Sequence, residues 1–153
     1  MTTIYAVPAN GHTFDLYLYD FAPELQRVAL DLFELLAGVV PAWCRAIHCH
    51  FGDSEGADAT CQADYDYRNA TIVIGAKFFR HDEADRVETL LHELLHVQCA
   101  PMADTARDAI KSLLAGQPEG AGAAIRATIT GAAEQTVCDL TAALLPTYTE
   151  PAR

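Results

Sequence analysis

The segment His92-Glu93-Leu94-Leu95-His96 combines residue types and a spacing that suit metal chemistry. Two histidines four positions apart on a helix lie one turn apart on the same face, so both imidazoles can bind one metal ion. Zinc is the metal that this spacing favours, and the glutamate between the histidines can act as a general base on an attacking water. The segment therefore predicts Zn2+ ligands at His92 and His96 and a general base at Glu93.

The surroundings of this segment predict an amphipathic helix that begins near Asp82 and ends before Pro101. Asp82 can cap the helix, and the acidic residues in its first turn favour the positive end of the helix dipole. Leucines and a valine at helical spacing predict one apolar face, with the histidines on the adjoining stripe. The competing interpretation is a pair of histidines that only border the core. The helical placement makes the metal site the stronger hypothesis.

A catalytic zinc site usually has three protein ligands, and our candidate for the third is Glu134. Its neighbours in the last predicted helix are apolar or uncharged, and a carboxylate in apolar surroundings needs a cationic partner. The alternative is an exposed glutamate on a polar helix face. Cys138 competes as a ligand from one turn further on, although we prefer a buried structural thiol there. Asp139 is expected to hydrogen-bond to His92 or His96 instead.

The two helices resemble the signature helices of the small gluzincins, in particular the ImmA/IrrE-like metallopeptidases of bacteria, phages and mobile elements. The likeness rests on the HExxH segment and on residues 133–146, AEQTVCDLTAALLP. It implies a zincin-like core: an N-terminal helix, a small antiparallel sheet, the HExxH helix, and a C-terminal helix that supplies Glu134 as the third zinc ligand. Residues 97–133 depart from the family because they form a longer connection, whose extra helix could cover the cleft.

The rest of the chain predicts an α+β fold in a single domain, residues 1–153. Alternating apolar and polar residues predict strands, and apolar residues three or four apart predict helices. The expected strands are two hairpins, residues 3–7 with 13–19 and 61–67 with 71–74, and a strand within 43–51. The expected further helices are 20–36, 104–116 and 125–146, with a loop at 117–122.

Charge and apolar patterning exclude several classes of protein. The chain has 21 Asp and Glu against 10 Lys and Arg, a net charge of −11, and no basic cluster. Nucleic acid and anionic membranes repel such a chain. Because no apolar run can cross a bilayer and no signal segment is visible at the start, we expect a cytoplasmic location.

The five cysteines lack the Cys-x-x-Cys spacing, which predicts reduced and mostly buried thiols. Cys44, His48 and His50 share a face if residues 43–51 form one strand. They are therefore a weaker candidate for a second metal site.

Together these observations predict a zinc-dependent metalloendopeptidase that hydrolyses a protein or peptide substrate. Tyr65, Tyr67 or another tyrosine is a candidate for stabilising the oxyanion, and the sequence does not choose among them. The pattern predicts no oligomeric state. The alternative function is that of a zincin-derived, non-catalytic zinc-binding protein that regulates through protein contact. Replacing Glu93 separates the two, because only catalysis requires a base at that position.

Overall fold

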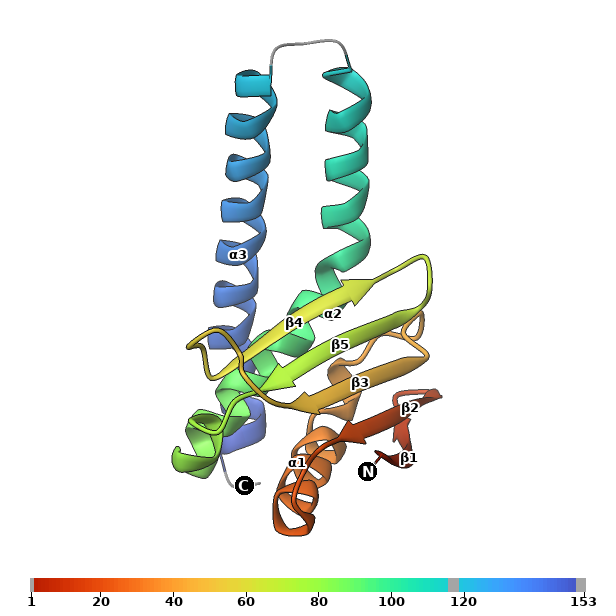
Figure 1. The fold of residues 1–153 in the computed structure, drawn as a ribbon, viewed down its shortest axis with the longest axis vertical. Coiled ribbons are helices and arrows are strands. Elements are labelled where there is room, and N and C mark those ends of the chain that lie inside the picture. The colour runs from red at the N-terminus through yellow and green to blue at the C-terminus, as the bar shows by residue number, and fades with distance from the viewer. Residues whose placement is uncertain (1, 116–118, 151–153) are drawn as a thin grey trace.

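The computed structural model describes residues 2–115 and 119–150, which form one β-sheet and a set of helices (Figure 1). The strands are β1 (Thr2–Ala9), β2 (His12–Tyr19), β3 (Ala46–Phe51), β4 (Ala59–Asp64) and β5 (Asn69–Ile74). The α-helices are α1 (Pro23–Leu35), α2 (Glu83–Leu113) and α3 (Glu119–Thr149), and short 3-10 helices cover Ala37–Val39 and Phe78–Arg80. The predicted α+β class is confirmed.

The sheet is mixed, so the expectation of an antiparallel sheet is wrong. Its strand order is β1-β2-β3-β5-β4. The outer pairs, β1 with β2 and β4 with β5, are the two predicted hairpins, and both are antiparallel. The inner pairs, β2 with β3 and β3 with β5, are parallel. Helix α1 returns the chain to the end of the sheet where β2 began, as a parallel connection requires. Because β4 comes last in the strand order and, among the described strands, pairs only with β5, it forms an edge of the sheet.

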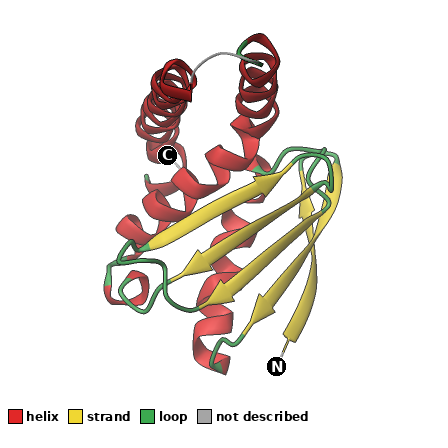
Figure 2. Cartoon of the chain, turned by 45° about the horizontal axis from the view of Figure 1, so that its top comes forward, coloured by secondary structure: helices red, strands yellow, loops and turns green. Residues whose placement is uncertain are grey.

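The helices cover one face of the sheet and enclose the hydrophobic core with it (Figure 2). The register aligns Leu16 with Ile47 and Ile47 with Ala70 across three strands, and all three side chains are buried. Phe33 of α1 and Leu91 of α2 are buried in the same core. Burying one such large side chain contributes about 1.5–3 kcal/mol, so the first half of α2 is held firmly against the sheet.

Helix α2 begins where the sequence predicts, because the Asp82 side chain caps it by accepting a hydrogen bond from the Asp85 backbone N–H at 3.0 Å. It does not end before Pro101, because residues 104–113 continue α2 instead of forming a separate helix. Proline removes one N–H donor, which usually bends a long helix rather than ending it when both halves stay packed. Figure 1 shows α2 changing direction as it leaves the sheet.

Helix α3 is longer than the predicted span of 125–146, since it covers Glu119–Thr149 and contains both Gly131 and Pro146. Residue 116, the last of the predicted helix 104–116, and residues 117 and 118 of the predicted loop lie outside the described residues. α3 runs antiparallel to α2, and the paired helices extend away from the sheet (Figure 1). The connection between His96 and Glu134 is therefore a projecting helical hairpin, and its residues Asp104, Arg107 and Ile129 help to line a pocket that also contains His96 and Glu134.

In the described parts of the chain, no helix combines the length and apolar character needed to cross a membrane.

Candidate metal centre

His92 and His96 lie on consecutive turns of α2, and their Nε2 atoms are 3.2 Å apart. The rings meet edge to face, with centroids 4.9 Å apart. Leu91, Leu94 and Leu95 are buried in the core and fix the rotation of the helix about its axis. The histidine side chains emerge at the border of the core, 24% and 30% exposed, so both are open to a metal ion.

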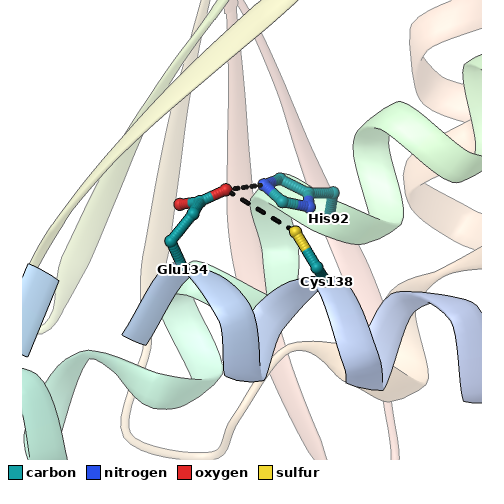
Figure 3. A group of neighbouring side chains, drawn as sticks. All are labelled: His92, Glu134 and Cys138. Carbon is teal, nitrogen blue, oxygen red and sulfur yellow. Dashed lines mark hydrogen bonds and ion pairs between the residues drawn. The ribbon is translucent and has the colours of Figure 1, made fainter. Parts of the chain in front are cut away.

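Glu134 approaches both histidines from α3, and Figure 3 shows its carboxylate beside His92. Its Oε1 lies 3.2 Å from His92 Nε2, and its Oε2 lies 3.3 Å from His96 Nε2. The antiparallel hairpin explains this meeting. His96 lies 17 residues before the end of α2 (113 − 96), and Glu134 lies 15 residues after the start of α3 (134 − 119). Val137, fully buried one turn beyond Glu134, packs α3 onto the core.

Glu93 is buried beside this group, with 9% of its surface exposed. Burial, followed by the negative charge of Glu134, raises the pKa of the Glu93 carboxyl to about 7. Burial, followed by the charge of Glu93, also raises the pKa of Cys61 on the edge strand β4. A carboxyl that titrates near neutral pH can both accept and return a proton, as a general base must.

The pKa of His96 is lowered, mainly by burial and further by His92, while the Glu134 carboxylate acts in the opposite direction. Burial disfavours the protonated form because that form carries the charge. The neutral imidazole that results is the form of histidine that binds a metal ion.

Cys138 is the functional candidate that the sequence interpretation undervalued, because the structure exposes its side chain instead of burying it. Its Sγ lies 3.9 Å from Glu134 Oε1, and Figure 3 shows it beside His92. One donor atom each from His92, Glu134 and Cys138 lie within 4.8 Å of one another. The i,i+4 spacing of Glu134 and Cys138 was the available signal, because it puts both on one helix face.

Asp139 does not take the expected place beside the histidines. Its Oδ1 accepts a hydrogen bond from Gln135 Nε2 of the same helix at 2.9 Å, in an exposed position. Five positions after Glu134, Asp139 points about 140° away around the helix, which explains why the two carboxylates have different surroundings.

Two pockets flank the site along the edge strand β4. One, of about 360 Å3, is lined by Asp58 and Ala59 at the start of β4 and by His92, Glu93 and Cys138. The other, of about 250 Å3, is lined by residues 61–63 of β4, by His96 and by Glu134. The described side chains lining these two pockets include no tyrosine, and Tyr65 lines a different pocket with Asp64 and Asp104.

The structure does not bring together Cys44, His48 and His50, the weaker candidate for a second metal site. The Cys44 thiol is buried in the core and donates a hydrogen bond to the Ala46 carbonyl. His48 and His50 stack instead on Tyr17 and Tyr19, and the Tyr19 hydroxyl lies 2.9 Å from His48 Nδ1. These rings occupy the sheet face opposite to the buried Ile47 and Cys49, because side chains alternate along β3.

The donor set fits zinc. Imidazole nitrogens with a carboxylate, and a thiol nearby, suit zinc, whereas magnesium and calcium prefer all-oxygen sites. With zinc bonds of about 2.0–2.1 Å, nitrogen and oxygen ligands of a tetrahedral site are about 3.3 Å apart. The His92–His96, His92–Glu134 and His96–Glu134 separations are 3.2, 3.2 and 3.3 Å. Glu134 uses Oε1 toward His92 and Oε2 toward His96, and each separation is close to that between two ligands of one zinc ion.

Comparison of this chain with protein-family models, curated proteins and solved structures finds no match.

Proposed function

We propose that this chain is a zinc-dependent metallopeptidase of the gluzincin type, similar to the ImmA/IrrE-like enzymes. The observation that carries the proposal is the position of the Glu134 carboxylate, within 3.3 Å of Nε2 atoms of both His92 and His96. Three ligands converge from two helices, and Glu93 lies buried beside them. Three protein ligands with one free position are the arrangement of catalytic zinc sites.

The order of elements supports a zincin-like core. Helix α1 and all five described strands precede the HExxH helix α2, and the later helix α3 supplies the third candidate ligand. This is the order that the resemblance implies, with a mixed sheet in place of the antiparallel one. The helical hairpin of residues 97–133 lengthens the connection between the two signature helices without separating their donor atoms.

Each residue has a defined part in the proposed reaction. When bound, zinc would polarise the carbonyl of the scissile amide and acidify a water. His92, His96 and Glu134 hold the metal. Glu93 accepts a proton from the attacking water, whose oxygen forms a bond to the carbonyl carbon. As the carbon–nitrogen bond breaks, Glu93 returns that proton to the leaving amine, so the residue ends in its starting state.

The substrate in this proposal is an extended peptide that pairs with β4. Among the described strands, β4 lies at the sheet edge next to α2, and pairing of an extended peptide with such an edge is a common recognition mode. The two pockets beside β4 lie on either side of the metal donors. They would take side chains from the two sides of the scissile bond.

The test is cleavage of a mixed peptide library by the zinc-loaded protein, with products identified by mass spectrometry. Wild type is expected to cleave, and cleavage is expected to stop with a chelator. Glu93→Gln should keep zinc and lose cleavage by at least 100-fold. Glu83→Gln, in the exposed first turn of α2, is the matched control and should behave as wild type. Cleavage by Glu93→Gln near the wild-type rate would contradict the proposal.

The alternative, a non-catalytic zinc-binding regulator, is favoured by one observation, the thiol of Cys138 beside the ligands. A fourth protein ligand closes a zinc site, and closed sites are typical of structural zinc. Zinc binding without library cleavage, in both wild type and Cys138→Ala, would favour this alternative over the peptidase.

A further inference from the structure

Two pairs of metal-binding side chains face each other across the hairpin of α2 and α3. His92 and His96 form the pair on α2, and Glu134 and Cys138 form the pair on α3, each with i,i+4 spacing. Because the helices run antiparallel, the first member of one pair lies level with the second member of the other. The observed contacts agree, since His96 meets Glu134, and a ring nitrogen of His92 lies within 4.8 Å of donor atoms of Glu134 and Cys138.

The position of Cys138 is close to that of a ligand. A zinc–sulfur bond is about 2.3 Å and a zinc–oxygen bond about 2.0 Å, so sulfur and oxygen ligands of one tetrahedral zinc are about 3.5 Å apart. Cys138 Sγ and Glu134 Oε1 are 3.9 Å apart. The Cys138 side chain is exposed, so we expect rotation about its Cα–Cβ bond to close this difference.

The other thiols are less suited to this role. Cys61 and Cys99 line the pocket that contains His96, and burial raises the pKa of both, so forming a thiolate there costs more than at an ordinary exposed thiol. Cys44 and Cys49 are fully buried in the core. Cys138 alone among the five belongs to the compact group of donors formed by described residues.

We propose that the Cys138 thiolate is a fourth ligand of this site and closes the position that an attacking water needs. The proposal rests on the proposed zinc peptidase and gives it a resting state. In that state the thiol proton is released to solvent as the sulfur binds the metal. Hydrolysis then requires the Cys138 side chain to leave, so Cys138 regulates access of water and substrate to the metal.

The experiment uses the full chain loaded with cobalt(II), a spectroscopic substitute for zinc. Thiolate ligation to cobalt gives a charge-transfer absorption in the near ultraviolet. Wild type is expected to show this band at one cobalt per chain, and both Cys138→Ala and Cys138→Ser should lack it. Cys99→Ser, which removes a nearby thiol outside the donor group, should keep it. We also expect about tenfold weaker zinc affinity in Cys138→Ala and peptide cleavage at least as fast as in wild type.

The outcomes separate this inference from the peptidase itself. One bound cobalt without the band in wild type, or a band that persists in Cys138→Ala, overturns thiol ligation and leaves the peptidase proposal standing. The band in wild type, with no cleavage by wild type or Cys138→Ala, supports thiol ligation and contradicts the peptidase. Failure of cobalt and zinc to bind overturns both. Circular dichroism of each variant verifies that the helices remain folded.

Discussion

The Nε2 atoms of His92 and His96 are 3.2 Å apart, on consecutive turns of one helix. Two protonated imidazoles would repel each other strongly at this distance, so the pair suits a shared cation. We predict that His92→Ala or His96→Ala reduces zinc affinity by at least 100-fold, measured by competition with a chromophoric chelator. His50→Ala, a histidine on the opposite sheet face, is the control and should bind as wild type. Full zinc occupancy in either α2 variant would contradict the assignment.

We predict that both the negative charge and the carboxylate oxygens of Glu134 contribute to zinc affinity, since its two oxygens face different histidines. Glu134→Ala should weaken zinc binding by 10- to 100-fold, and Glu134→Gln should weaken it less, because an amide oxygen still ligates weakly. Zinc titration calorimetry compares them. Glu150→Gln, an exposed glutamate after the end of α3, provides the control. Equal affinity of Glu134→Ala and wild type would transfer the role of third ligand to Cys138.

The raised pKa of the Glu93 carboxyl predicts that the free energy of unfolding depends on pH when a chelator keeps the protein free of metal. The pKa of this carboxyl is about 7 when folded and near the ordinary 4.5 when unfolded, so between these values the folded state binds more protons. The free energy of unfolding therefore falls as pH rises from about 4.5 to 7. Glu93→Gln removes this loss and should become more stable than wild type by up to about 3 kcal/mol above pH 7, with the difference vanishing below pH 4.5.

Urea unfolding at a series of pH values measures that difference directly. Glu83→Gln changes an exposed carboxyl and should show a flat difference from wild type over the same range. If the free energies of unfolding of Glu93→Gln and wild type change with pH in parallel, burial does not raise the pKa of the Glu93 carboxyl.

Val137 is predicted to couple the stability of α3 to the metal site. Its side chain is fully buried and lies one turn beyond Glu134. Val137→Ala should lower the free energy of unfolding by about 2 kcal/mol and weaken zinc binding, since the Glu134 carboxylate loses its support. Leu140→Ala, at a 37% exposed position of the same helix, should cost less and leave zinc affinity unchanged. Thermal unfolding with and without zinc gives both quantities; equal zinc-induced stabilisation in the two variants would rule out the coupling.

Several parts of the fold follow from local sequence signals. The cap at Asp82 and the leucine face predict the start and the buried side of α2, and the two hairpins follow from alternation with a turn between. The parallel pairing in the centre of the sheet does not follow, because alternation identifies strands without their partners. The continuation of α2 through Pro101 was missed because a local rule ends helices at proline, whereas packing against α3 holds both halves together.

Some residues of the candidate site can also be predicted from local spacing, whereas others depend on the tertiary structure. The i,i+4 rule brings His92 and His96 together without knowledge of the tertiary fold, and Glu134 was identified by its apolar neighbours. The choice between Cys138 and Asp139 depended on helical phase: four positions return to within about 40° of Glu134, and five lie about 140° away. Exposure of Cys138 could not be predicted, because it depends on how far α3 sits from the sheet.

The most direct measurement is an anomalous-scattering map at the zinc absorption edge from crystals of the zinc-loaded full chain. The account predicts one strong peak within about 2.0–2.3 Å of donor atoms of His92, His96 and Glu134. A zinc peak at other residues, or no peak at saturating zinc, would contradict it.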